Sequence, residues 1–296
     1  MEFIVELTNI KLIKKYAKLN NVKYLLVSYQ GLSFNYGITY DFEELQEIYN
    51  IVKNTKLKLI LNAERLFSDD DLILVKELVD KEFFSNFEYI TYSDFGFKTI
   101  LENNSLGEKL IFRASTYLTN KEDVELYSKI NSYVVVSSEI SSNELISLVN
   151  NLSEKVIIDV FGQSVCFYSR RPLLTNYFIY RNIAKDPNKL SYNIIEELRE
   201  DRLAIIEDET GTKILEPYYH ALVEELNQIS NAELGIIGLR NLKSKDAYAV
   251  VNAYNDLVNT SDPKAFYDML DNHGIIAYKG AYNIKSVLLK GGSGCE

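Results

Sequence analysis

Eight short runs of β-branched and aliphatic residues alternate with amphipathic segments, and this alternation constrains the fold more than any other feature of the chain. Such runs separated by helices are typical of parallel βα units rather than of a sandwich or a helical bundle. Several runs are almost continuously apolar, as strands buried on both faces must be. The runs are FIVEL from Phe3, KYLLVSY from Lys23, KLKLILNA from Lys56, FEYITYS from Phe87, KLIFRAS from Lys109, SYVVVSS from Ser132, KVIIDVF from Lys155 and ELGIIGLR from Glu233.

The segments between the runs carry helix start signals. DFEELQEIYNIVKN begins at Asp41 and SDDDLILVKELVDKEF at Ser68, and both have acids in the first turn, where negative charge interacts favourably with the helix dipole. SSNELISLVNNL starts in the same way. Eight strands with intervening helices predict a (β/α)8 TIM-like barrel. An open doubly wound sheet is the alternative, although no GxGxxG follows the first run to support a dinucleotide-binding version of it.

A long interval between the seventh and eighth runs breaks this rhythm. Alternating residues around DETGT predict a β-hairpin insertion there, and YYHALVEELNQI after it predicts a helix. Because no linker rich in Pro, Gly or Ser sets the insertion apart, we expect a single domain over 1–290. The terminal GGSGCE, residues 291–296, predicts a flexible tail.

Composition narrows the class of protein. A net charge of -10 argues against a protein that coats nucleic acid through a broad basic face. Two cysteines cannot form a disulfide framework and favour a reducing, cytoplasmic location, and no apolar run reaches the ~20 residues that span a membrane. His220 and His273 lie far apart with no HxxxH or CxxC pattern, so we expect no metal site.

Residues just past the strand ends of such a barrel converge on one mouth, where function normally resides. There, Asp94 and Glu139 are candidates for a general acid and base pair, and the alternative is a helix cap or an ion-pair partner of Arg113 or Arg170. Caps and solvated loops normally account for about half of such positions. The positions at the mouth are Ser28, Gln30, Asn62, Glu64, Asp94, Arg113, Ser115, Thr116, Ser138, Glu139, Gly162, Gln163 and Arg240.

The stretch VFGQSVCFYSRRPLLTNYF holds the densest basic group, Arg170, Arg171 and Arg181. Guanidinium groups bind oxyanions in a bidentate way, so this group suits a carboxylate, a phosphate or an RNA backbone, and a solvated surface run is the alternative. We expect the stretch to form the end of the seventh strand and a following loop, with Ser169 and both leading arginines at the mouth.

Cysteine or serine chemistry in this stretch is less well supported. Cys166 could act as a thiolate, but nothing in the sequence places a histidine beside it, so a small buried side chain is the preferred interpretation. FYSRR around Ser169 is not the GxSxG of a nucleophile elbow.

The stretch DVFGQSVCFYSRRPLLTNYF resembles the signature region of peptidase family U32, the collagenase-like proteases. Further segments resemble that family in the same order along the chain, and six ordered segments are more specific than any one of them. These segments are YSDFG from Tyr92, RASTYLTN from Arg113, VVVSSEIS from Val134, EDETGTKIL from Glu207 and IIGLRNLKSKDAYAVVNAYND from Ile236.

The chain also departs from the family pattern. Many relatives carry four cysteines that resemble iron-sulfur ligands, whereas here Pro172 stands at one of these positions and the whole chain has two cysteines. The resemblance therefore implies no iron-sulfur cluster and no protein-bound cofactor in this chain. Ser138 stands where the family has an arginine, and Ile237 or Gly238 displaces a family glutamate, which puts independent catalysis in doubt.

Short, cysteine-poor family members are associated with prephenate-dependent hydroxylation of the tRNA wobble uridine to 5-hydroxyuridine, beside a longer homologue. The resemblance thus implies a subunit of a hetero-oligomer, with prephenate and tRNA as candidate ligands and no membrane partner. A collagenase-like peptidase and a non-catalytic binding module that retains the barrel are the alternatives. The candidate catalytic residues are Asp94, Glu139 and Ser169, and the candidate binding residues are Arg113, Ser115, Gly162, Arg170, Arg171 and Arg240.

Overall fold

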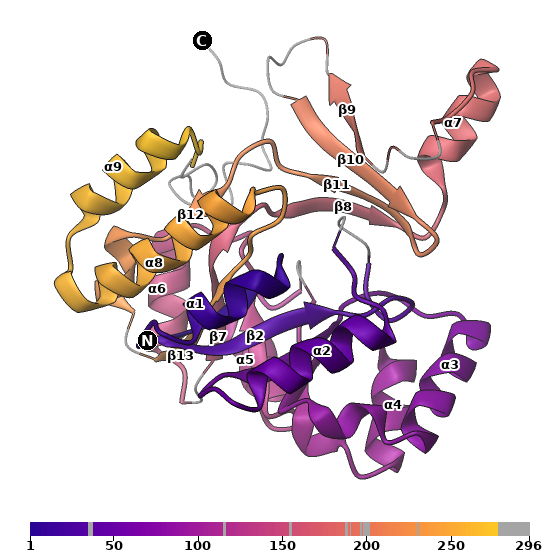
Figure 1. Cartoon of the computed structure of the whole chain (residues 1–296), viewed down its shortest axis with the longest axis horizontal. Helices are drawn as coiled ribbons and strands as arrows, with labels where there is room; N and C mark the ends of the chain where they lie inside the picture. The colour runs from indigo at the N-terminus through magenta and orange to yellow at the C-terminus, as the bar shows by residue number, and fades with distance from the viewer. Residues whose placement is uncertain are drawn as a thin grey trace.

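A closed barrel of eight parallel strands forms the body of the protein, as the sequence predicts (Figure 1). The computed structural model describes residues 1–34, 38–114, 117–153, 156–186, 189, 191–195, 197, 202–229 and 231–277. The barrel closes because β7 pairs with β6 on one side and with β13 on the other. Its strands are β1 (Glu2–Glu6), β2 (Val22–Ser28), β3 (Lys58–Ala63), β4 (Tyr89–Tyr92), β5 (Leu110–Phe112), β6 (Tyr133–Val136), β7 (Val156–Gly162) and β13 (Ala232–Ile237).

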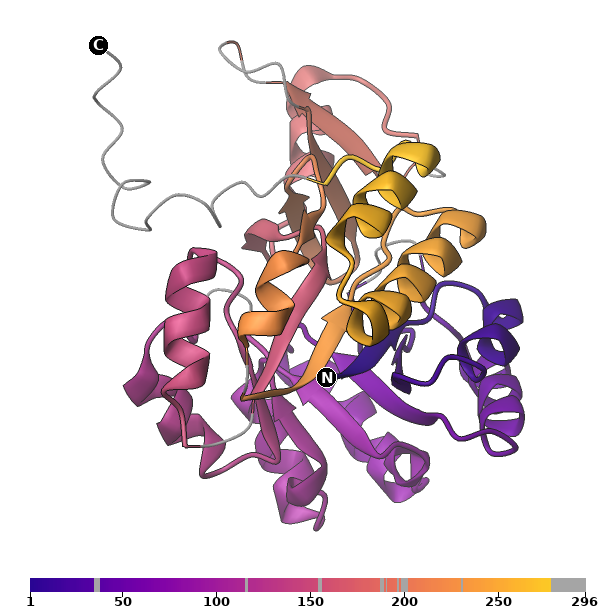
Figure 2. The same ribbon diagram turned by 90° about the vertical axis from the view of Figure 1, so that its left-hand side faces the viewer.

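Helices surround the barrel (Figure 2). Asp41, Ser68 and Ser141 each close a capping box at the start of a helix, so the predicted start signals are confirmed. The helices around the barrel are α1 (Ile13–Tyr16), α2 (Phe42–Val52), α3 (Asp69–Asp80), α4 (Phe95–Asn103), α5 (Lys121–Ser128), α6 (Ser142–Asn150), α8 (Ser244–Thr260) and α9 (Pro263–His273). Short 3-10 turns are η1 (Ile10–Leu12), η2 (Phe83–Asn86), η3 (Gly107–Lys109) and η4 (Glu224–Gln228).

Side-chain alternation along the strands divides the core into two layers. In β1, Phe3 and Val5 join the large cluster that packs against the helices, whereas Ile4 joins a smaller cluster inside the barrel. Successive residues of a strand point to opposite faces, so the residue two positions after an inward one also points inward. The inner cluster consists of Ile4, Tyr24, Leu26, Ile60, Ile111, Val135, Ile157, Leu234 and Ile236.

The insertion between β7 and β13 is an antiparallel sheet with the strand order β8-β11-β10-β9 (Figure 1). It consists of β8 (Val165–Ser169), α7 (Leu173–Arg181), β9 (Ser191–Ile195), β10 (Arg202–Asp208) and β11 (Gly211–Leu215). Strands β10 and β11 form the hairpin predicted at DETGT, with Asp208 opposite Gly211. Phe34 from the barrel packs against Ile206 and Leu215 of this sheet.

Two local predictions in the insertion are wrong. The segment YYHALVEELNQI is not an α-helix: it forms β12 (His220–Ala221), which pairs with the end of β7, and then η4. Residues 219–223 are all buried in succession, and an amphipathic helix would expose part of such a run. The expected loop after β7 is instead β8 and α7, because β8 pairs with β11, some 45 residues further along.

The described residues contain no helix that is both long and apolar enough to cross a membrane. The predicted tail, 291–296, lies outside the described residues, and so does Ser115. The domain boundary expected at 290 stays a prediction.

Candidate functional site

Charged side chains close the barrel interior just above its apolar layer. Each stands two residues after an inward-facing isoleucine, so the strand alternation carries it to the same axis. The pairs along the chain are Ile4 with Glu6, Ile111 with Arg113, and Ile157 with Asp159. The charged side chains of the barrel mouth therefore lie directly above the apolar inner cluster.

Arg113 is the centre of this layer. Its Nη2 donates to Asp159 Oδ1 at 2.9 Å, and its Nη1 lies 3.5 Å from Glu64 Oε2. Burial alone would lower the pKa of Arg113, but Asp159 and Glu64 hold that pKa above its ordinary value, so the guanidinium stays charged. Nη1 is buried and has no hydrogen-bond partner within the described part of the chain, which leaves a donor at the mouth.

A second buried ion pair lies on the other side of the mouth. Arg240 Nε donates to Glu6 Oε1 at 3.3 Å, and the other carboxylate oxygen of Glu6 accepts from the backbone N–H of Leu239 at 2.7 Å. Tyr219 donates to the backbone carbonyl of Arg240 at 2.6 Å and so holds the segment after β13 in place. Two arginines and three carboxylates thus lie close together at the largely buried mouth.

His220 enters the mouth from β12. β12 pairs with Phe161 and Gly162 at the end of β7, beyond the part of β7 that pairs with β6 at Ile157 and Ile158. This pairing places His220 at the mouth. Burial lowers the pKa of His220 to about 4, with Arg113 and Arg240 adding to the effect and Asp159 opposing it. The imidazole is therefore neutral at pH 7, and its Nδ1 lies 3.3 Å from Ser164 Oγ.

These groups line a small cavity of about 30 Å³. Gly162 and Gly238 form part of its wall, and a Cβ on Gly162 would lie 3.5 Å from the Cα of Gly238. The lining residues are Glu64, Arg113, Ser138, Asp159, Phe161, Gly162, Gln163, Ser164, Val165, His220, Gly238 and Arg240.

A second, larger and more open cleft of about 430 Å³ adjoins this cavity, and the two share Glu64 and Val165. The cleft lies between the ends of β3, β4 and β5 and the insertion strands β8 and β11. Lys213 of β11 stands 4.8 Å from the ring centre of Phe34 and 5.2 Å from that of Tyr168. The cleft is lined by Glu64, Arg65, Leu66, Ser93, Ala114, Val165, Cys166, Phe167, Tyr168 and Lys213.

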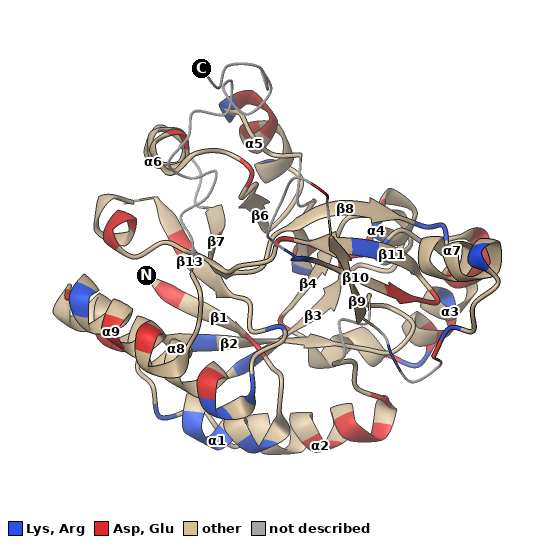
Figure 3. Ribbon diagram, turned by 90° about the horizontal axis from the view of Figure 1, so that it is seen from above, with Lys and Arg blue, Asp and Glu red and all other residues tan. Residues whose placement is uncertain are grey.

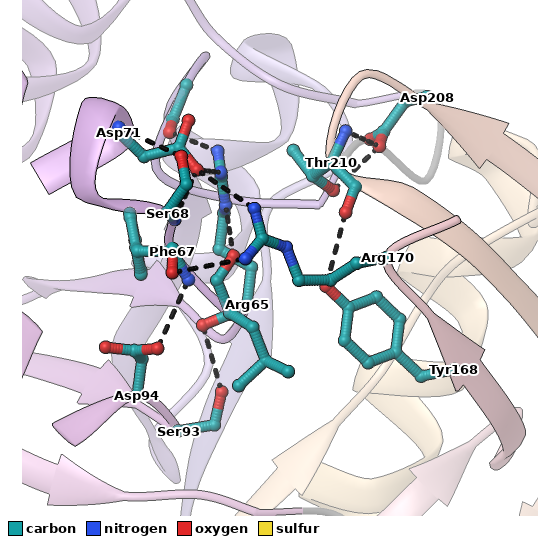
Figure 4. A network of polar contacts seen from close by, with 12 residues as sticks. Arg65, Phe67, Ser68, Asp71, Ser93, Asp94, Tyr168, Arg170, Asp208 and Thr210 are labelled. Atoms are coloured by element: carbon teal, nitrogen blue, oxygen red, sulfur yellow. Dashed lines mark hydrogen bonds and ion pairs between the residues drawn. The ribbon is translucent and has the colours of Figure 1, made fainter. Parts of the chain in front are cut away.

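Polar contacts join the insertion to the barrel beside this cleft (Figure 4). Arg65 Nη2 lies 2.6 Å from Asp71 Oδ2, at the first turn of α3. Arg170 reaches across from the insertion, 3.9 Å from the same carboxylate oxygen and 3.5 Å from the backbone carbonyl oxygen of Phe67. Hydrogen bonds to Ser68 and the charge of Arg65 hold the pKa of Asp71 below its ordinary value, although burial opposes them.

A buried glutamate holds α7 to the insertion sheet. Glu207 accepts from the backbone N–H groups of Leu174 at 2.7 Å and Thr175 at 3.1 Å, and from Lys185 Nζ at 2.6 Å. Burial alone would raise the pKa of Glu207, but the hydrogen bonds from Lys185, Thr175 and Thr212 hold it below the ordinary value. Glu207, the first residue of the segment EDETGTKIL, therefore caps the first turn of α7 and holds this helix to the insertion sheet.

The structure brings together three of the predicted binding residues. Arg113, Gly162 and Arg240 all line the cavity at the mouth. Arg170 lies at the edge of the second cleft, and the side chain of Arg171 is exposed.

The three predicted catalytic residues lie apart from that cavity. Asp94 caps α4: its oxygens accept from the backbone N–H groups of Phe97 at 3.0 Å and Phe67 at 3.2 Å. Glu139 is exposed as a whole residue, but neighbouring protein partly covers its carboxyl group and raises its pKa. Ser169 Oγ accepts from the backbone N–H of Arg171 at 3.1 Å.

Cys166 is exposed, so the preferred interpretation of a buried cysteine is wrong. It belongs to the insertion sheet rather than the barrel, and its side chain lines the open cleft. Sequence reasoning also missed Glu6, Asp159 and His220. A charged residue inside an otherwise apolar strand was the available signal for Glu6 and Asp159, since a buried charge requires a partner.

The sequence model of Peptidase family U32 matches residues 30–272, which is most of the chain. The chain belongs to Peptidase family U32. A search of solved structures finds a U32 peptidase, Mk0906, with a TM-score of 0.51 and 12% sequence identity, covering 80% of this chain and 92% of that one. At this identity the likeness concerns the fold, and it agrees with the barrel described above.

Two curated relatives extend the comparison. The chain is 26% identical over 102 residues to "tRNA hydroxylation protein P2" of Bacillus subtilis (strain 168), a match that covers 33% of each chain. It is 23% identical over 243 residues to "Uncharacterized protease MJ0090" of Methanocaldococcus jannaschii, covering 77% of this chain and 58% of that one. The chain thus spans between a third and three fifths of the lengths of these relatives.

Proposed function

We propose that this U32 protein acts with a longer homologue in the prephenate-dependent hydroxylation of the tRNA wobble uridine. The observation that carries the proposal is the cleft beside the mouth, whose walls combine two cationic side chains, Arg65 and Lys213, with the rings of Phe167 and Tyr168. A small ring compound with two carboxylates is complementary to such walls, because cations bind its carboxylates and aromatic side chains pack on its ring. Prephenate is a compound of this kind.

The similarity to tRNA hydroxylation protein P2 supports the same proposal. The cleft opens beside the buried mouth, where the N–H groups of Arg113 Nη1 make no hydrogen bond within the described residues. A carboxylate that reached this donor would form a charge-assisted hydrogen bond in a poorly hydrated site, where such bonds are strong.

The decisive measurement is mass spectrometry of wobble nucleosides in tRNA from a strain that lacks the gene. Complementation with the intact gene restores 5-hydroxyuridine, whereas the Phe167→Ala and Lys213→Gln variants restore less of it. Phe167 is 44% exposed, so its truncation changes the cleft wall with little effect on folding. Lys264→Gln, at an exposed lysine on α9, is the matched control and restores the modification fully. Unchanged 5-hydroxyuridine in the deletion strain, with any longer homologue that could substitute also removed, would refute the proposal.

Calorimetry tests prephenate binding directly, without relying on tRNA modification in the cell. We expect the purified protein to bind prephenate, Lys213→Gln to weaken binding, and Lys213→Arg, which retains the charge, to weaken it less. Equal binding by all three proteins would exclude the cleft as the prephenate site.

A hydrolase is the second candidate, because Ser164 and the neutral His220 lie within hydrogen-bond reach at the mouth. A hydroxyl beside an imidazole is the arrangement that activates a serine nucleophile. The pKa of about 4 makes His220 a weak base at pH 7, which disfavours this function. Cleavage of gelatin by the purified protein, lost in Ser164→Ala, would favour the peptidase; no cleavage with or without added divalent metal would remove it.

A further inference from the structure

Helix α7 stands apart from the barrel at the outer end of the insertion sheet (Figure 1). Its first turn is fixed by Glu207, and Leu173 N–H donates to Thr212 Oγ1 at 3.0 Å. Leu174 is the buried residue of this helix. The helix is therefore held firmly at its base while most of its side chains face solvent.

The solvent face of α7 carries large rings. Tyr180 is 85% exposed and Tyr177 is 53% exposed. Tyr180 is three residues after Tyr177 and Arg181 is four after it, so Tyr177 neighbours both side chains on the helix surface. Such exposure of neighbouring aromatic side chains on an ordered helix marks an interaction surface.

Aromatic and cationic side chains continue onto β9. Phe178 packs against Tyr192 with ring centres 5.1 Å apart, and Lys189 Nζ lies 4.4 Å from the centre of the Tyr192 ring. Between Arg170 and Tyr192 the sequence has five Lys or Arg residues and one Asp, a net charge of +4 in a chain of -10. Arg170 and Lys185 of this segment are ion-paired with Asp71 and Glu207, so Arg181 and Lys189 are the cations beside these rings. Acids resume from residue 196 onward.

This combination fits unpaired RNA. Unstacked bases pack on exposed aromatic side chains, and the phosphates between them bind arginine and lysine. A paired RNA helix keeps its bases stacked inside and offers nothing for Tyr177 and Tyr180 to contact. A protein partner would also cover Ile179, which is 72% exposed, whereas stacked bases need only the rings.

We propose that α7 and β9 form a stacking platform for unpaired RNA bases, with Tyr177 and Tyr180 as the rings and Arg181 as the phosphate contact. The proposal deepens the tRNA function proposed above and rests on it for the identity of the RNA. The platform lies on the same insertion that supplies Lys213 to the cleft, so one element would bind the RNA and border the small-molecule site (Figure 3).

Fluorescence anisotropy with a labelled RNA hairpin that has an unpaired loop tests the platform in the intact chain. The double variant Tyr177→Ala, Tyr180→Ala weakens binding by about 10- to 100-fold, as expected for lost base stacking. Tyr177→Phe with Tyr180→Phe retains the rings and binds like the wild type, and Ile179→Ala is the matched control with no change. Arg181→Gln lowers the slope of log affinity against log salt by about 0.7, as one lost phosphate contact does.

Each contrary result has a distinct meaning. Loss of affinity in Ile179→Ala equal to that of the tyrosine variant, or equal binding to a closed RNA duplex, would overturn the stacking platform. So would a wild-type protein that does not bind the hairpin at low salt. If the tyrosine variant binds RNA normally while Lys213→Gln abolishes wobble hydroxylation, the platform is wrong and the proposed function stands. If the tyrosine variant loses RNA binding while the deletion strain keeps 5-hydroxyuridine, the platform stands and its RNA is not the wobble substrate.

Discussion

The barrel mouth and the insertion hold their charges in opposite ways. At the mouth, Arg113 and Arg240 are buried and bound to carboxylates on other strands of the barrel. On the insertion, Arg171 and Arg181 are exposed, and Arg181 lies one helical turn from the exposed ring of Tyr177. Buried pairs are sensitive to the loss of one partner, whereas exposed cations contribute little to folding and remain free to meet a large anion. The difference agrees with the two proposals above, a small-molecule site beside the mouth and an RNA platform on the insertion.

The largest effect should come from removing the central cation of the mouth. Arg113→Ala leaves Asp159 and Glu64 buried without their partner, and we expect it to lower the free energy of unfolding by about 3–5 kcal/mol. Urea denaturation measures this change. Arg171→Ala, with an exposed side chain, is the control and should change stability by less than about 0.5 kcal/mol. Similar losses of stability in both variants would contradict the difference between buried arginines at the mouth and exposed arginines on the insertion.

The next effect is the dependence of stability on pH that His220 confers on the mouth. The pKa of His220 is about 4 in the folded protein and about 6.5 when unfolded, so its contribution to stability is complete above pH 6.5 and is lost as the pH falls towards 4. The loss amounts to about 3 kcal/mol. Denaturation curves at pH 7.5, 6, 5 and 4 give the free energy of unfolding at each pH. This free energy should fall less steeply with decreasing pH in His220→Asn than in the wild type. Identical slopes would mean that His220 titrates normally.

A comparable effect, confined to the insertion, should follow from adding a side chain at Gly211 in the β10–β11 hairpin. Gly211 has φ +138°, and a Cβ there would lie 2.3 Å from the carbonyl oxygen of Ser169. We expect Gly211→Ala to cost about 3 kcal/mol locally and to expose α7 to proteolysis while the barrel stays folded. Gly274→Ala, where φ is +60° and a Cβ would meet open space, is the control at about 1 kcal/mol. Unfolding of both regions together in Gly211→Ala would show that they are not separable.

The smallest effect should come from the bridge between the two regions. Arg170 is half exposed and lies 3.9 Å from Asp71, so Arg170→Ala should lower stability by less than about 1 kcal/mol. Arg65→Ala removes the buried arginine that holds the same carboxylate at 2.6 Å and should cost more. Thermal unfolding of the two variants compares them directly. A larger loss in Arg170→Ala would mean that the insertion depends on this bridge.

Most elements of the barrel could be predicted from local patterns in the sequence. All eight predicted strands and the caps at Asp41, Ser68 and Ser141 are present, because strand alternation and helix capping depend on residues a few positions apart. Part of the site could be read in the same way, since Arg113, Gly162 and Arg240 follow strand ends. Asp94 also follows a strand end, yet it caps α4, and the sequence position alone does not separate the two roles.

Local pattern in the sequence specifies the eight barrel strands, the capped helix starts and the hairpin at Asp208. Glu6 and Asp159 follow the same strand alternation, although sequence reasoning did not single them out. The tertiary structure brings His220 to them, because β12 pairs with β7 across more than 50 residues. It also decided the exposure of Cys166 and the position of α7, which depend on strand pairing and on Glu207. Contacts between residues distant in the chain leave no periodicity behind, and their free energy exists only once the chain has folded.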